Sequence, residues 1–185
     1  AHGAKANMET MVFFPSSLER GKIIGASIYG PTLVSIEGTY DEANRFCSEL
    51  ADNNPWAFVN INMRPYYAEG SKTLGYEIAE QLGWRSPDHC VVPAASGELH
   101  TKIWKGLEEF RDIGLIEKSK TNMHLIQAEG CSPIVNAFDL GNSQVDPVKP
   151  DTIAKSLAIG NPAAGAYALQ TLSQTAGIAI AVPET

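Results

Sequence analysis

The sequence predicts an α/β fold built on parallel β-sheets, and three observations support this prediction. Short apolar runs alternate along the chain with amphipathic stretches that have a helical period. The connections between successive apolar runs are too long for hairpins, so right-handed strand–helix–strand units are expected. The chain has 185 residues, of which 44% are hydrophobic and 19% charged, enough for one large domain or two small lobes with a proper core.

Strands and helices alternate in the first third of the chain. The expected strands are short β-branched or aromatic runs at 10–14, 32–36 and 56–61. A helix between the first two strands would begin with a capping box formed by Ser16 and Glu19. A second capping box, formed by Thr39 and Glu42, would open the next helix. The apolar face of that helix consists of Ala43, Phe46, Cys47 and Leu50.

The same alternation continues to the end of the chain. The expected strands are 89–95, 125–128 and 178–182, and the expected helices are 71–82, 99–110, 151–159 and 163–175. One face of the helix at 71–82 would carry Leu74, Ile78 and Leu82. One face of the helix at 99–110 would carry Leu99, Ile103, Leu107 and Phe110. Residues 62–70 interrupt the alternation because they are polar and aromatic without periodicity. This stretch could cross between two lobes or be a long surface connection.

Charge and cysteine content argue against several classes of function. The net charge of −7 disfavours a nucleic-acid groove and an anionic membrane surface, and the apolar runs are too short to span a bilayer. Cys47, Cys90 and Cys131 lie far apart in the sequence and form no CxxC pair. We therefore expect three reduced core cysteines in a cytoplasmic protein that has no nucleic-acid or membrane partner.

Familiar catalytic and metal-binding signatures are missing from the sequence. Residues 70–73 end like a P-loop, but Ser71 stands where that loop needs glycine. The histidines at positions 2, 89, 100 and 124 have no mutual metal-ligand spacing, so no metal site is expected.

One strand–turn–helix sequence has the pattern of an anion site. A strand that ends at Pro93 is followed by the small residues 94–97, and Glu98 opens the clearest amphipathic helix of the chain. Free backbone N–H groups and about half a positive charge from the helix dipole converge at such a turn, and small side chains let a phosphate approach. The alternative is a plain surface turn in which Ser96 is an N-cap and Glu98 a routine first-turn acid. Arg64 could hold an anion in a bidentate pair or simply face solvent.

Several stretches, taken in order, resemble threonine synthases. They are FFPSSLERGK at 13–22, YG at 29–30, EGSKT at 69–73, the strand–turn–helix at 91–106, QAEGCSP at 127–133 and IGNPA at 159–163. They occur in the family's order and spacing and cover nearly the whole chain.

The resemblance implies a two-lobe α/β enzyme of the tryptophan synthase β-like type (fold-type II), incomplete at both ends. Residues 1–62 would belong to the smaller lobe and 63–185 to the larger lobe, which binds the phosphate of pyridoxal 5′-phosphate (PLP). It implies conversion of O-phosphohomoserine and water to threonine and phosphate, and a homodimer could form. The cofactor-binding residues would be Ala95, Ser96, Gly97, Glu98 and Leu99.

Some positions depart from the family pattern. Glu98 and Leu99 replace small or amide residues, a change that backbone donors tolerate. The substrate, a phosphorylated amino acid, would contact Asn62 and Arg64, although Tyr67 stands where the family usually has arginine. In family order the Schiff-base lysine lies upstream of Ala1, so no catalytic residue is assigned in this chain, which is expected to be inactive alone. Alternatives are a catalytically dead α/β binding or regulatory module, or another fold-type II lyase such as a threonine dehydratase relative.

Overall fold

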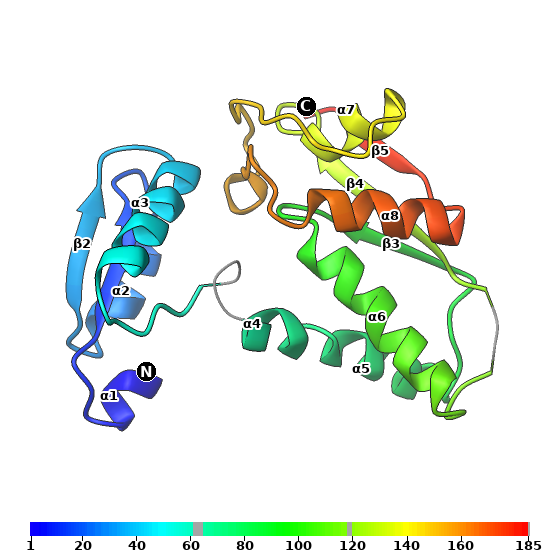
Figure 1. Ribbon diagram of the computed structural model, residues 1–185, viewed down its shortest axis with the longest axis horizontal. Coiled ribbons are helices and arrows are strands. Elements are labelled where there is room, and N and C mark those ends of the chain that lie inside the picture. The colour runs from blue at the N-terminus through cyan, green and yellow to red at the C-terminus, as the bar shows by residue number, and fades with distance from the viewer. Residues whose placement is uncertain (61–64, 118–119, 185) are drawn as a thin grey trace. The chain divides into compact units, whose positions relative to one another are not determined.

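The computed structural model describes residues 1–60, 65–117 and 120–184, with the side chains at 65 and 66 also outside the description. The chain divides into two compact units, Ala1–Phe58 and Val59–Thr185, here called the N-terminal and C-terminal units (Figure 1). Each unit contains parallel strands joined through helices, and this confirms the predicted α/β class.

The N-terminal unit is a strand–helix–strand–helix unit that follows a short first helix. Its elements are α1 (His2–Lys5), β1 (Met11–Pro15), α2 (Arg20–Ser27), β2 (Thr32–Ile36) and α3 (Tyr40–Asn53). The strands β1 and β2 pair in parallel, with Met11 opposite Thr32. The predicted capping box of α3 is confirmed, because Thr39 and Glu42 each accept a hydrogen bond from the other's backbone N–H. Of the predicted apolar face, Ala43 and Cys47 are buried.

Two expectations for this unit are wrong. The residue that caps α2 is Glu19, which makes no side-chain capping bond, while Ser16 Oγ lies 3.1 Å from Glu37 Oε2. The described part of the expected third strand, residues 56–60, has no strand pairing. Phe58 is buried there and stacks on Phe13 of β1 at 6.4 Å between ring centroids. That apolar run therefore contributes side chains to the packing rather than a strand to the sheet.

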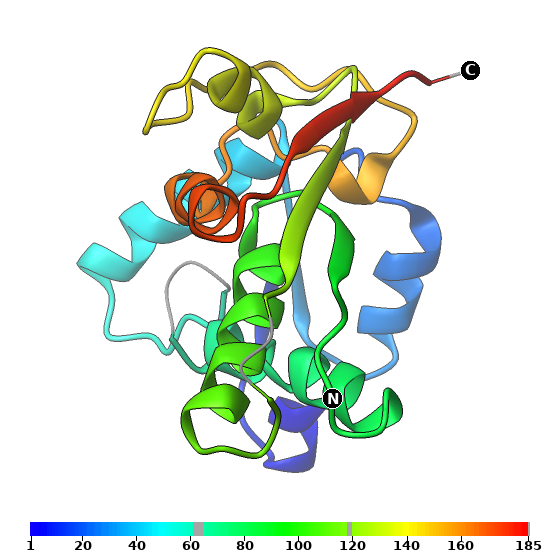
Figure 2. The same cartoon turned by 90° about the vertical axis from the view of Figure 1, so that its right-hand side faces the viewer.

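The C-terminal unit contains a three-stranded parallel sheet. Its elements are α4 (Pro65–Gly70), α5 (Thr73–Gln81), β3 (His89–Pro93), α6 (Glu98–Asp112), β4 (Asn122–Ala128), α7 (Pro133–Asp139), the 3₁₀ turn η1 (Lys155–Leu157), α8 (Gly165–Thr175) and β5 (Ala179–Val182). The strand order is β3–β4–β5, with Val91 opposite His124 and Leu125 opposite Ala179. Figures 1 and 2 show α6 and α8 on the same side of this sheet.

The core of this unit lies between the sheet and its helices. Its two clusters of buried residues are Ala94, Leu125, Ile134, Val135, Ala137, Ala168, Leu169, Leu172 and Ala179, and Ala79, Val92, Ile103, Leu107, Ile116 and Met123. The α5 helix faces α6 through Gly75, and of its predicted apolar residues only Ile78 packs against the core cluster. A Cβ on Gly75 would lie 2.6 Å from the carbonyl oxygen of Ile103, so the two helices approach too closely for a larger residue. Leu74 and Leu99 are 38% exposed, contrary to prediction.

Three further segments differ from the sequence predictions. Residues 65–70 of the supposed irregular stretch form α4, and α7 was not expected. The expected helix at 151–159 is reduced to the three residues of η1, because tertiary hydrogen bonds hold this segment. Thr152 Oγ1 and the Ile153 N–H donate to Glu184 at 2.5 and 2.8 Å, and the Asp151 N–H donates to the Gly130 carbonyl at 2.8 Å.

Candidate functional site

The β3–α6 turn, residues 95–100, lies at the carboxyl edge of the three-stranded sheet. β3 ends at Pro93 and α6 begins at Glu98. Gly97, the N-cap residue of α6, has φ +85° and ψ −9°, a left-handed conformation that favours glycine. The carboxyl edge of a parallel sheet is where open α/β folds bind ligands. The structure therefore places the predicted anion turn in the appropriate part of the fold.

Two peptide planes of this turn are fixed through their carbonyl groups. The Ala94 carbonyl accepts a hydrogen bond from Gln127 Nε2 at 3.5 Å, and the Ser96 carbonyl accepts one from the Ala164 N–H at 3.0 Å. In a trans peptide the N–H points opposite to the carbonyl. Since both carbonyls face the protein, the N–H groups of Ala95 and Gly97 face outward.

Free donors concentrate at the turn. Five of its backbone N–H groups have no hydrogen-bond partner among the described residues: Ala95, Ser96, Gly97, Leu99 and His100. The sixth, on Glu98, lies 3.4 Å from Ser96 Oγ. Unsatisfied N–H groups at a helix N-terminus, reinforced by the helix dipole, bind phosphate groups. The turn therefore fits the phosphate of PLP, and His100 adds a donor that the sequence prediction did not include.

The Glu98 side chain lies away from these donors. Its Oε1 is 3.7 Å from Lys102 Nζ, one helical turn toward the C-terminus of α6. The side chain is 15% exposed and lines a cavity of about 490 Å³ with residues of α6 and α8. The first-turn carboxylate is therefore directed along the helix toward a cation, which reduces its competition for the donors at the N-terminus.

Position 97 requires glycine for a second reason besides its backbone conformation. A Cβ there would lie 3.1 Å from both the Ala164 carbonyl oxygen and the Ala168 Cβ. Gly97 is buried, so it permits the close approach of α8 as well as the left-handed turn. The expectation that Ser96 is the N-cap residue is wrong, since Gly97 holds that position and Ser96 is buried.

Three of the stretches that carry the family resemblance meet around this turn. Gln127 is fully buried, and its Oε1 accepts hydrogen bonds from the N–H groups of Ile134 and Val135 at 2.9 and 3.2 Å. Cys131 Sγ lies 3.4 Å from the Ile159 carbonyl oxygen. The stretch 159–163 leads directly to Ala164, whose N–H donates to the Ser96 carbonyl. Sequence reasoning did not assign Gln127 a role, although a polar residue inside an apolar strand was a signal for one.

The stretch at 69–73 is joined to α6 by ion pairs. Glu69 lies 2.8 Å from Lys72 Nζ, 3.1 Å from Lys102 Nζ and 2.8 Å from Lys105 Nζ. Hydrogen bonds from these lysines lower the pKa of Glu69 to about 2. Lys72 also pairs with Glu109 at 2.8 Å, and this bond raises the pKa of Lys72. The three lysines are thus engaged in a network that fastens α4 and α5 to α6.

The remaining sequence predictions concern the substrate contacts, a metal site and a membrane span. Asn62 and Arg64 lie outside the described residues, so their predicted role in substrate binding stays a prediction. Within the described ranges, no group of three or more histidine, cysteine, aspartate or glutamate side chains could hold a metal ion. Among the helices that the structure describes, none is long and apolar enough to cross a bilayer.

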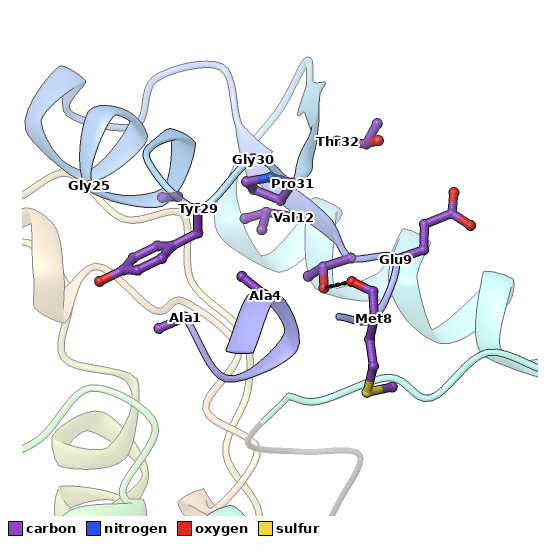
Figure 3. Close-up of a pocket in the computed structure, with 12 residues that line it drawn as sticks. Ala1, Ala4, Met8, Glu9, Val12, Gly25, Tyr29, Gly30, Pro31 and Thr32 are labelled. Atoms are coloured by element: carbon purple, nitrogen blue, oxygen red, sulfur yellow. Dashed lines mark hydrogen bonds between the residues drawn. The ribbon is translucent and has the colours of Figure 1, made fainter. Parts of the chain in front are cut away.

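A pocket in the N-terminal unit has a different character. It has a volume of about 420 Å³ and lies between α1, the end of α2 and the starts of β1 and β2 (Figure 3). Its lining is mostly small and apolar, with Glu9 as its acidic side chain and no lysine or arginine. This pocket therefore lacks the side chains that would attract a phosphate.

Comparisons with known proteins agree with this geometry. The family model for "Pyridoxal-phosphate dependent enzyme" matches residues 1–185. Threonine synthase of Methanosarcina acetivorans is 35% identical over 99% of this chain and 45% of its own length, and that of Methanocaldococcus jannaschii is 34% identical over 100% and 45%. The chain thus spans about half the length of the curated relatives that it matches.

Solved structures of low sequence identity show the same fold. A fungal L-serine ammonia-lyase from Rhizomucor miehei has a TM-score of 0.78 at 18% identity, over 97% of this chain and 54% of that one. The processed form of threonine deaminase isoform 2 from Solanum lycopersicum has a TM-score of 0.69 at 19% identity, over 97% and 49%. The solved structures confirm the predicted fold-type II architecture. The family model and the curated relatives confirm the resemblance to threonine synthases and the cofactor class. The chain belongs to the family of pyridoxal-phosphate dependent enzymes.

Proposed function

We propose that this chain forms the cofactor-phosphate-binding part of a threonine synthase that converts O-phosphohomoserine and water to threonine and phosphate. The observation that carries the proposal is the set of five unpartnered N–H groups at the β3–α6 turn. The identity of up to 35% with threonine synthases supports the choice of reaction. The match over about 45% of their length supports the view that other parts of the enzyme are needed for activity.

The roles of the described residues follow from the turn. The backbone N–H groups of residues 95–97 and of Leu99 and His100 would hold the phosphate by charge-assisted hydrogen bonds. Gly97 gives the turn its conformation, and Ala164 keeps the Ser96 carbonyl directed inward. When bound, PLP supplies an electron sink for the reacting amino acid. The lysine that would form its Schiff base is proposed to lie outside this sequence, and residues 62 and 64 are proposed to contact the phosphorylated substrate.

A chimeric enzyme tests the proposal. The matching stretch of the Methanosarcina acetivorans threonine synthase would be replaced by this chain, and phosphate release from O-phosphohomoserine would be measured. Circular dichroism and the absorbance of bound PLP would establish that the chimera is folded and loaded. We expect threonine and phosphate in equal amounts. A folded, loaded chimera that releases neither would contradict the proposal and favour a catalytically dead binding module.

A further inference from the structure

Gln127 is a fully buried polar side chain beside the β3–α6 turn. It lies in β4 and is 1% exposed. Leu125 of the same strand and Ile134 of α7, both fully buried, are near it. Burying an amide is costly unless it is hydrogen-bonded. Its Oε1 accepts from the N–H groups of Ile134 and Val135, and its Nε2 donates to the Ala94 carbonyl.

The two acceptor contacts fix the orientation of this amide. Backbone N–H groups can only donate, so the atom that faces Ile134 and Val135 at 2.9 and 3.2 Å must be the oxygen. The NH₂ group is then directed toward the end of β3, where it lies 3.5 Å from the Ala94 carbonyl oxygen. The start of α7 and the start of the turn are thus joined through one side chain.

We propose that Gln127 is a positioning residue for the phosphate site: its NH₂ group draws the Ala94 carbonyl inward and so turns the Ala95 N–H toward the anion. The inference rests on the proposed function of the turn. The carbonyl of Ala94 and the N–H of Ala95 belong to one planar trans peptide and point in opposite directions. A donor on the carbonyl side therefore sets the direction of the N–H and strengthens it as a donor.

Replacement by glutamate separates this role from packing. Gln127→Glu keeps the size of the side chain and two oxygens that can accept from the start of α7, but an ionised carboxylate has no N–H for Ala94. Gln127→Met removes both kinds of contact. Gln174→Glu, on an exposed position of α8, is the matched control for the change in charge.

The experiment compares these variants by ¹⁵N NMR without ligand and by titration with pyridoxine 5′-phosphate, which lacks the aldehyde that reacts with lysines. In Gln127→Glu, at a pH where its ¹³C resonance shows the carboxyl group to be ionised, we expect displaced amide resonances at 95–97, unchanged protection of the Ile134 and Val135 amides from hydrogen exchange, and about fivefold weaker binding. In Gln127→Met both regions should change. Gln174→Glu should match the wild type.

Lowering the pH provides a rescue, because a protonated glutamate regains an O–H donor for Ala94. The ¹³C resonance of the introduced carboxyl group reports when it protonates, and the resonances at 95–97 should then return toward those of the wild type. The inference is overturned if the turn resonances of Gln127→Glu equal those of the wild type at a pH where the ¹³C resonance shows the carboxyl group to be ionised, or if both variants displace turn and α7 together. A wild type that does not bind pyridoxine 5′-phosphate would contradict the proposed function, while the ligand-free spectra would still decide the role of Gln127.

Discussion

His100 is a fully buried imidazole in the first turn of α6. Burial lowers the pKa of His100 to about 4, because the charged form loses its hydration. Between pH 6.5 and 4 the unfolded chain therefore binds a proton that the folded chain does not bind. Stability contributed by the neutral imidazole is present at pH 7 and decreases as the pH falls through this window.

The first prediction is that His100→Leu removes this pH dependence. The free energy of unfolding of the variant, relative to the wild type, should increase by about 2 kcal/mol when the pH is lowered from 7 to 5. Urea denaturation at the two pH values measures the difference, and His2→Leu, at an exposed position, should show no such change. Equal pH dependence of His100→Leu and wild type would mean that the imidazole is accessible to water.

Substitution of Glu98 tests how its carboxylate, in the first turn of α6, affects anion binding at the β3–α6 turn. Because its carboxylate is directed toward Lys102, only a long-range repulsion should remain. We predict that Glu98→Gln binds pyridoxine 5′-phosphate about two- to threefold more tightly at low ionic strength and about equally at 0.5 M salt. Calorimetric titration measures both, with Asp112→Asn at the opposite end of α6 as the control. A gain of tenfold or more that persists in salt would show that the carboxylate faces the anion.

At the residue scale, the sequence located the turn but not the groups that orient it. Residues 95–99 were recognised because small residues before a helix form a local pattern, and this requires only neighbours in sequence. The contributions of Gln127 and Ala164 depend on contacts between residues more than 30 positions apart. A glutamine within an apolar strand and a histidine within an apolar helix face were the visible signs of such contacts, and neither reveals its partner.

At the scale of elements, the two ends of α6 offer a matched pair of glycines. Gly97 and Gly114 both have positive φ, +85° and +72°, but a Cβ on Gly114 would meet nothing within 4 Å, whereas one on Gly97 would contact α8. We predict that Gly114→Ala costs about 1 kcal/mol and Gly97→Ala about 2 to 3 kcal/mol. Urea denaturation measures both. Equal costs would show that only the backbone conformation, and not the packing of α8, requires Gly97.

Elements with strong local signals were predicted well, and the others were decided by tertiary contacts. The capping box and apolar face of α3 and the strands β2, β3 and β5 agree with the sequence to within a few residues. In contrast, residues 151–154 have a helical composition but are held by Glu184 and Gly130, so only a 3₁₀ turn forms. The α7 helix begins at Pro133, and the N–H groups of Ile134 and Val135 in its first turn donate to the Gln127 side chain, a contact that the sequence analysis did not recognise.

At the scale of the whole molecule, two units are present, and neither unit carries an assigned Schiff-base lysine. The lysines nearest the turn in sequence, Lys102 and Lys105, pair with Glu69. We predict that incubation with PLP followed by borohydride leaves no stoichiometric pyridoxyl group on a specific lysine. Mass spectrometry of the digested protein measures this, with an intact threonine synthase as the positive control. A single fully modified lysine would contradict the view that the chain is inactive alone.

The most direct test of the central claim is a residue-resolved titration of the wild-type chain. ¹⁵N-labelled protein would be titrated with pyridoxine 5′-phosphate and, in parallel, with pyridoxine, which lacks the phosphate. Backbone donors at the N-terminus of α6 predict large downfield amide shifts confined to residues 95–100 with the phosphate ester and none there with pyridoxine. Shifts centred on Lys102 and Lys105, or equal effects of the two ligands, would contradict the assignment of the β3–α6 turn as the phosphate site.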